Sequence, residues 1–157
     1  KKMKLNNLIC VAPDVGGVER TRALSRRLNS SIAIIDKRRP APGKSEVMNI
    51  VGSVKNKNCV IVDDIIDSGG TIVNAVEALK NKGAKDVYVY ITHAVLSGEA
   101  IYKIEKSKIK KLITTDTIDN SKKIARSKKV EIISLAPMIS EAMKRIANST
   151  SVSSLFK

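Results

Sequence analysis

Short apolar runs alternate along this chain with segments that have helical periodicity. Five of the runs have the length of buried strands, at residues 8–12, 32–35, 59–62, 87–92 and 109–114. A further short run at 48–51 also favours a strand. Helical patterns separate most of these runs, which is typical of repeated strand–helix–strand units. The chain is therefore predicted to adopt an α/β fold, with a mostly parallel open sheet and helices on both faces.

Three segments carry the helical pattern. Residues 18–28 predict a helix that ends at Asn29, and a second helix follows residue 71 and ends near Gly83, since glycine suits the left-handed residue that closes a helix. Near the C-terminus, apolar residues recur at helical spacing, namely Leu135, Met138, Ile139, Ala142, Met143 and Ile146. We expect this last stripe to pack against the core.

Four loops are expected to meet at one edge of the sheet. They follow predicted strands, at residues 13–17, 37–44, 63–71 and 92–98. Open α/β sheets bind ligands at the carboxyl ends of their strands. This edge is therefore the predicted place for a functional site.

The most informative loop follows the strand at 59–62. Two adjacent acids, Asp63 and Asp64, precede a third, Asp67, and then a loop of small residues, Ser68, Gly69, Gly70 and Thr71, which leads into a helix. Backbone N–H groups at a helix start suit a phosphate, and paired acids suit sugar hydroxyls or a cation. Ser68 or Thr71 could instead simply cap the helix. Because capping needs neither three acids nor two glycines, the pattern favours a sugar-phosphate site.

This stretch resembles the phosphoribosyl-binding motif shared by type I phosphoribosyltransferases and ribose-phosphate diphosphokinases. Other segments are similar to the diphosphokinases in particular, at residues 13–18, 33–40, 46–52, 92–98 and 151–156. The resemblance runs in one register from about residue 8 to the C-terminus. It implies the fold of type I phosphoribosyltransferases and the reaction of ribose 5-phosphate with Mg·ATP to give phosphoribosyl diphosphate and AMP.

The resemblance also assigns roles to individual residues. It implies that the 5-phosphate is held by Asp67, Ser68, Gly69, Gly70 and Thr71, and that Asp63 contacts the ribose hydroxyls. Asp64 either shares that contact or forms a structural hydrogen bond. Beyond this motif, the family places two transition-state stabilisers at positions that match Lys37 and Arg39, and a ligand of a divalent cation, Mg²⁺, at the position of Asp14. Lys37 and Arg39 could alternatively belong to a solvated basic face, and Asp14 could simply start a turn.

Family members have two similar domains. We interpret residues 1–157 as one domain that resembles the C-terminal half, with the N-terminal half absent from this sequence. The expected partners are ribose 5-phosphate, ATP and phosphoribosyl diphosphate, together with a homo-oligomer or a separate N-terminal half. Two alternatives remain open: a phosphoribosyltransferase of nucleotide metabolism, and a non-catalytic binding or regulatory subunit.

The amino-acid composition limits the kinds of binding partner that we expect. The formal net charge of +14 invites a nucleic-acid interpretation, but the lysines are scattered and aromatic residues make up only 3% of the chain, which is too few for base stacking. No apolar run approaches the roughly 20 residues that span a bilayer. The two cysteines lie in apolar strand patterns and make no disulfide framework. We expect a cytoplasmic protein without nucleic-acid or membrane partners. The roles of His93 and of the tail at 151–156 stay open.

Overall fold

A computed structural model describes residues 5–38 and 47–156. Within them, seven strands form one sheet with the order β3-β2-β1-β4-β5-β6-β7. The strands are β1 (Leu8–Ala12), β2 (Ser31–Arg38), β3 (Val47–Val51), β4 (Asn58–Ile66), β5 (Asp86–Ala94), β6 (Lys111–Thr115) and β7 (Val130–Ile133). All neighbours pair in parallel except β3, which is antiparallel to β2. The predicted mostly parallel open sheet is confirmed.

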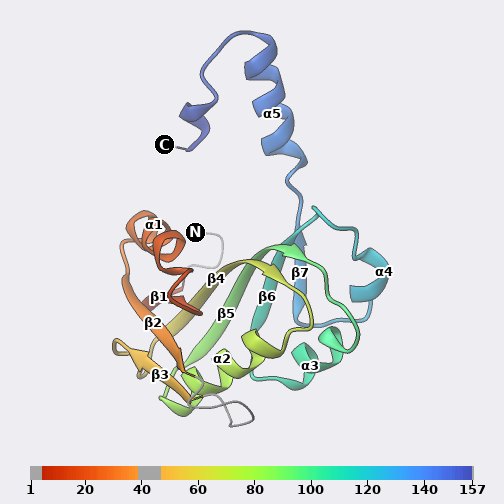
Figure 1. The fold of residues 1–157 in the computed structure, drawn as a ribbon. Helices are drawn as coiled ribbons and strands as arrows, with labels where there is room; N and C mark the ends of the chain where they lie inside the picture. The colour runs from red at the N-terminus through yellow and green to blue at the C-terminus, as the bar shows by residue number, and fades with distance from the viewer. Residues whose placement is uncertain (1–4, 39–46, 157) are drawn as a thin grey trace.

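Helices cover both faces of this sheet (Figure 1). The helices of the described residues are α1 (Val18–Leu28), α2 (Gly70–Asn81), α3 (Ala100–Lys106), α4 (Ser121–Ile124) and α5 (Ala136–Ala147), followed by a short 3₁₀ turn, η1 (Ser153–Phe156), and α5 alone among them projects away from the sheet. The chain moves one way across the sheet after β1 and the other way after β4. Because parallel crossovers are right-handed, α1 and α2 lie on opposite faces. None of the helices in the described part of the chain is long and apolar enough to cross a membrane.

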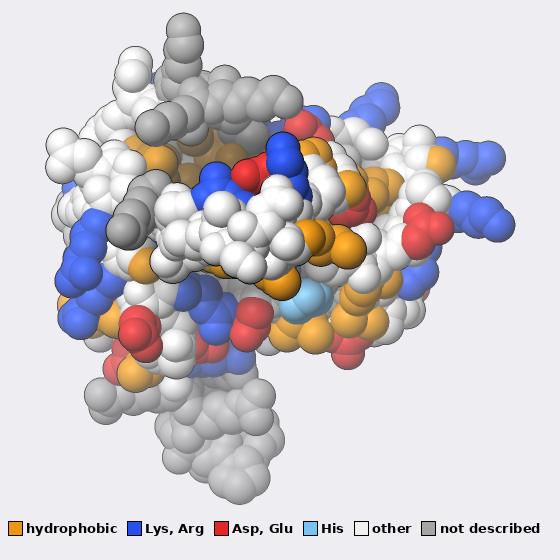
Figure 2. All heavy atoms as spheres, turned by 90° about the horizontal axis from the view of Figure 1, so that it is seen from above, with side chains coloured by type: hydrophobic (Ala, Val, Ile, Leu, Met, Phe, Trp, Pro, Cys, Tyr) orange, Lys and Arg blue, Asp and Glu red, His pale blue; other side chains and the backbone are white. Residues whose placement is uncertain are grey.

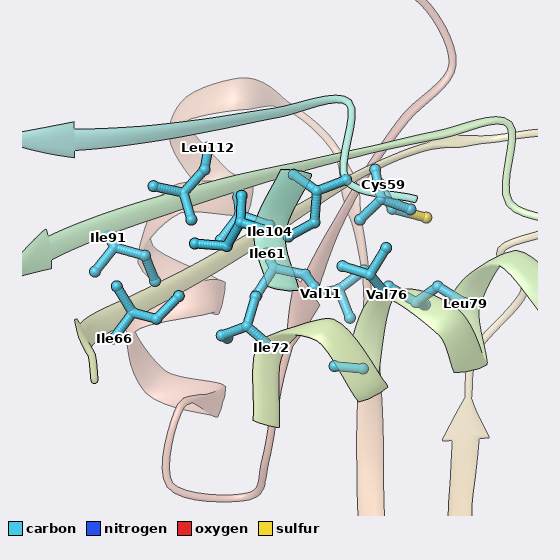
Figure 3. Packing of buried hydrophobic residues seen from close by; sticks show 14 of the residues in the cluster. Val11, Cys59, Ile61, Ile66, Ile72, Val76, Leu79, Ile91, Ile104 and Leu112 are labelled. Carbon is cyan, nitrogen blue, oxygen red and sulfur yellow. The ribbon is translucent and has the colours of Figure 1, made fainter. Parts of the chain in front are cut away.

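The main core lies between the sheet and α2. Alternate residues of β1 and β4, among them Val11 and Ile61, face Val76 of α2, and all three side chains are fully buried (Figure 3). The opposite face buries Cys10, whose Sγ lies 3.2 Å from the hydroxyl of Ser30. Burial on both faces explains why these strands appear in the sequence as continuous apolar runs.

β4 is longer than the apolar run that predicts it. It extends to Ile66, and its ladder with β5 pairs Asp63 with Ile91 and Ile66 with Ala94. Asp63 and Asp64 therefore belong to a strand and not to the loop after it. Aspartate disfavours strands, but pairing with a long neighbouring strand overrides that weak preference.

The expected core packing of the C-terminal stripe is wrong for the described chain. α5 forms as predicted, but it contains no buried residue, and Met143 and Ile146 are 64% and 67% exposed. The helix begins beside β7 at the edge of the sheet and runs away from it (Figure 1). Helical periodicity identifies an apolar face, but it does not say whether this chain covers that face.

Candidate functional site

The two adjacent acids lie near the carboxyl end of β4, where β1 no longer pairs with it. The side chain of Asp63 is 18% exposed and that of Asp64 is 63% exposed. Asp63 is partly enclosed because β5 continues beside it. One acid is thus set into the surface, and its neighbour is open to solvent.

Arg20 of α1 contacts both acids. Its Nη1 donates a hydrogen bond to Asp63 Oδ1 at 2.6 Å and lies 3.1 Å from Asp64 Oδ1, while Nη2 donates to Asp64 Oδ2 at 3.2 Å. Sequence reasoning missed this arginine because the contact joins residues 43 and 44 positions apart. A signal was nevertheless present, since a helix that follows β1 and packs beside β4 brings its first turn near the acids.

The arginine and the degree of burial move the pKa values of the two acids in opposite directions. Hydrogen bonding to Arg20 holds the pKa of Asp64 below its ordinary value. Burial raises the pKa of Asp63, although the N–H of Asp64 and the charge of Arg20 partly oppose that rise. The environment therefore favours a charged Asp64 more strongly than a charged Asp63.

Asp67 and the small residues after it connect β4 to α2. Gly69 is the residue before the helix, with φ of 77°, and Gly70 is the first helical residue. No side chain of the described residues caps this helix start, so capping by Ser68 or Thr71 is not what the structure shows. Thr71 is exposed and Gly70 is half-buried. Uncapped N–H groups in the first turn of a helix attract an anion.

Backbone hydrogen bonds join the loop after β5 to the segment that connects β4 and α2. The N–H of Val95 donates to the carbonyl of Ile66 at 2.9 Å, and the N–H of Ser97 donates to that of Asp67 at 3.2 Å. A Cβ added to Gly69 would lie 3.8 Å from Cα of Ala100, so α3 also approaches closely. These contacts fix the backbone from which the first-turn N–H groups project.

Asp14 lies in the turn after β1 and is exposed. Its Oδ1 accepts a hydrogen bond from the N–H of Gly17 at 2.8 Å, as expected of a residue that starts a turn. The described residues contain no cluster of three or more His, Cys, Asp or Glu side chains that could enclose a metal. Mg²⁺ often binds through one or two carboxylates together with substrate phosphates, and a single exposed carboxylate fits that mode.

The two predicted catalytic cations differ in their placement. Lys37 lies near the carboxyl end of β2, where it pairs with Met48 of β3 and is half-buried. Arg39 lies outside the described residues, as does most of the 37–44 loop. Of the four predicted loops, those at 13–17, 63–71 and 92–98 lie at the carboxyl ends of the neighbouring parallel strands β1, β4 and β5 and so share one edge, although residues 63–66 and 92–94 belong to the strands themselves.

His93 belongs to β5 and not to the loop after it. Its Nδ1 lies 3.0 Å from the hydroxyl of Thr117, and it is opposite Ile65 in the ladder with β4. Figure 2, a view from above, shows this single histidine in pale blue among hydrophobic side chains. The tail is tied to α1 by a hydrogen bond from Arg27 Nη2 to the carbonyl of Phe156 at 2.5 Å.

Sequence comparison finds relatives along nearly the whole chain. Residues 39–157 match the family described as the phosphoribosyl synthetase-associated domain. A ribose-phosphate pyrophosphokinase of Bradyrhizobium diazoefficiens is 51% identical over 155 residues, which cover 99% of this chain and 49% of that protein. The chain spans about half the length of the curated relatives it matches.

Comparison with solved structures finds similar proteins of related kinds. The phosphoribosylpyrophosphate synthetase of Mycobacterium smegmatis superposes with a TM-score of 0.82 at 32% identity, over 91% of this chain and 46% of that one. An adenine phosphoribosyltransferase of Trypanosoma brucei superposes with a TM-score of 0.54 at 21% identity, over 66% of this chain and 52% of that one. That second likeness concerns the fold alone, and it confirms the predicted fold of type I phosphoribosyltransferases.

Proposed function

The chain belongs to the phosphoribosyl synthetase-associated domain family, and from this premise we propose that it is the ribose 5-phosphate-binding part of a ribose-phosphate diphosphokinase. The complete enzyme would transfer the β,γ-diphosphoryl group of Mg·ATP to the 1-hydroxyl of ribose 5-phosphate, giving phosphoribosyl diphosphate and AMP. The observation that carries the proposal is an acid pair on β4 followed directly by an uncapped start of α2. This pairing suits one ligand that has both hydroxyls and a phosphate.

The 5-phosphate would bind at the start of α2. The N–H groups of Ser68 to Thr71 and the hydroxyls of Ser68 and Thr71 are its proposed donors, and the positive end of the helix dipole adds to their attraction. Asp67 would shape the loop, since its carbonyl already accepts the N–H of Ser97. The contacts to the loop after β5 hold these donors in place before the ligand arrives, so less ordering is needed on binding.

The sugar hydroxyls would donate to the acid pair. Asp63 is the better placed of the two, because its partial burial limits competition from water. Asp64 is exposed and makes two contacts with Arg20, so we assign it a shared contact with the sugar or a supporting one. Binding at both ends would fix the ring and direct the 1-hydroxyl toward the incoming diphosphoryl group.

We assign the transfer step to Lys37 and Arg39. Negative charge on the transferring group needs fixed cations, and a lysine at the end of β2 with an arginine two residues later can supply them. Asp14 would hold Mg²⁺ together with oxygens of the nucleotide. The metal supplies charge neutralisation on the phosphates when bound. We assign no side chain the role of general base.

The proposal also includes a second protein part that packs against this chain. The relatives are about twice as long as this chain, and the exposed apolar face of α5 is suited to a protein contact. We propose that the preceding half of such a protein, or a further copy of the complete one, covers α5. A cytoplasmic location remains our expectation, and the two free buried thiols are compatible with it.

Phosphorus NMR of the purified chain with ribose 5-phosphate and Mg·ATP tests the proposal. We expect ribose 5-phosphate to bind and Thr71→Ala, which removes one proposed hydroxyl donor to the phosphate, to weaken binding about tenfold, as loss of a hydrogen bond to a charged group would. Glu77→Ala truncates another exposed side chain of α2, six residues further along the helix, and should leave binding unchanged. AMP formation would exclude a non-catalytic subunit, binding without turnover would indicate a partial site, and no binding would contradict the proposal.

A further inference from the structure

We propose that Arg20 is a positioning residue for sugar recognition, an inference that rests on the proposed function of the site. The arginine fixes one oxygen of Asp63 and, in doing so, presents the other oxygen to the 2-hydroxyl of ribose. It would thereby set the preference of the site for ribose over deoxyribose.

The hydrogen bonds to Asp63 are unevenly distributed between its two oxygens. Oδ1 accepts the Nη1 of Arg20 at 2.6 Å and the backbone N–H of Asp64 at 3.0 Å. Both donors therefore bind the same oxygen, Oδ1. Within residues 5–38 and 47–156 no donor addresses Oδ2, which is therefore open to a ligand, and the two contacts to Oδ1 set the carboxylate plane before any ligand binds.

The second acid makes this positioning necessary. Two neighbouring carboxylates repel each other, and an unconstrained Asp63 could rotate away from Asp64. The guanidinium lies between them, with Nη1 near both carboxylates and Nη2 on Asp64. It therefore offsets the repulsion and holds the carboxylate of Asp63 in place beside that of Asp64.

An arginine suits this task better than a lysine. Its planar fork presents two nitrogens at a fixed separation, whereas an ammonium group is a single point charge on a flexible stem. Arg20 has a half-buried side chain, 34% exposed, and projects from the first turn of α1. The helix thus fixes the position of the guanidinium, and the guanidinium orients the two carboxylates.

The simpler interpretation is an ion pair that only ties α1 to β4. Partly exposed ion pairs add little to stability, and losing one would weaken all ligands equally or merely lower the melting temperature. A positioning role predicts something different, because only ligands that donate to Asp63 depend on the orientation of its carboxylate. The preference between two sugars separates the two interpretations.

Calorimetric titration with ribose 5-phosphate and with 2-deoxyribose 5-phosphate tests the proposal. The phosphate is common to both ligands, so the ratio of their dissociation constants reports hydroxyl recognition. We expect the unmodified chain to prefer ribose 5-phosphate by at least about tenfold, which is the effect of a hydrogen bond to a charged group. Arg20→Ala should reduce the ratio to near unity while binding of the deoxy sugar changes less.

Two further variants complete the design. Arg20→Lys keeps the charge and the fold but cannot reach both carboxylates in the same way, so most of the preference should also be lost. Arg22→Ala removes an exposed arginine from the same helix, two positions away and hence on a different face, and should keep the preference.

Each outcome decides between the interpretations. A normal preference in Arg20→Lys, or in a folded Arg20→Ala, would overturn the positioning role and leave the proposed function intact. Binding of both sugars by the unmodified chain without preference would also overturn it, while supporting the phosphate site. Failure of the unmodified chain to bind either sugar would refute the proposed function and this role with it.

Discussion

The carboxylate of Asp116 accepts a hydrogen bond from the backbone N–H of Leu135, with Oδ1 2.8 Å from the nitrogen. Its other oxygen, Oδ2, accepts the hydroxyl of Ser134. Asp116 follows β6, and Leu135 immediately precedes α5. One exposed acid therefore anchors the start of a helix that the described part of the chain leaves unburied.

Asp116→Ala should loosen α5 without weakening the sheet. Since α5 buries no residue, the melting temperature of the main body should hardly change, while hydrogen exchange of α5 amides accelerates. Hydrogen exchange read by NMR distinguishes the two regions. Asp119→Ala, which removes a similar contact to Ser121 at α4, serves as the control and should leave α5 unchanged. Equal exchange of α5 in Asp116→Ala and in the unmodified chain would contradict the anchoring role.

The same anchor should depend on pH. The contacts to Leu135 and Ser134 hold the pKa of Asp116 below its ordinary value, so its contribution is complete above that ordinary value. The contribution is lost as the pH falls through the lowered pKa of the folded state. Protection of α5 amides should therefore decrease in acid before the sheet unfolds, and Asp116→Asn should remove this step.

Gly69 and Gly70 provide a matched pair of substitutions at the start of α2. Gly69 has φ of 77°, so Gly69→Ala should cost about 1–2 kcal/mol of stability, because an L-residue resists the left-handed conformation. Gly70 has ample space for a Cβ and begins the helix, so Gly70→Ala should be neutral or slightly stabilising. Urea denaturation measures both variants. Equal destabilisation would show that the backbone at Gly69 is not constrained as described.

Cys59 should be almost inert in the native state. It is fully buried, and burial raises its pKa to about 11, so that roughly one thiol in a thousand is ionised at pH 8. Labelling with a thiol reagent at that pH should be slow until urea unfolds the chain. A cysteine introduced by Val15→Cys, at a position 70% exposed, should react quickly and marks the rate of an open thiol. Native Cys59 labelled at that rate would contradict its burial.

Two apolar truncations compare the core with α5. Ile61→Ala removes a fully buried side chain of β4 and should cost about 2–5 kcal/mol. Met143→Ala removes a side chain that is 64% exposed and should change the stability of this chain by less than about 0.5 kcal/mol. Chemical denaturation of the chain alone gives both values. A cost above about 1 kcal/mol for Met143→Ala would mean that the chain covers α5 itself.

Much of the fold could be predicted from the alternation of apolar runs and helices, because strands buried on both faces leave a strong signal. The exceptions have physical reasons. β7 has only four residues, and Ile133 at its end is 47% exposed, so its pattern is weak. β4 reaches Ile66 because pairing with β5 outweighs the poor strand preference of two aspartates.

The candidate site was only partly predictable for a related reason. Local spacing identified the acids and the glycine loop, since these lie within one short segment. Arg20 contacts Asp63 only after β1, α1 and β4 have assembled, so no local pattern contains that contact. The apolar stripe of α5 correctly predicted a helix. Whether that stripe is buried depends on what packs against it, which the helical spacing of the apolar residues does not show.

Binding of ribose 5-phosphate at the start of α2 is tested most directly by titrating it into the ¹⁵N-labelled chain and following the amide shifts by NMR. We predict saturable changes that are largest at Ser68, Gly69, Gly70 and Thr71, with smaller ones at Asp63 and Asp64. Inorganic phosphate alone should shift the amide signals of Ser68 to Thr71 but not those of Asp63 and Asp64. No saturable change, or changes confined to residues 136–156, would contradict the proposed site.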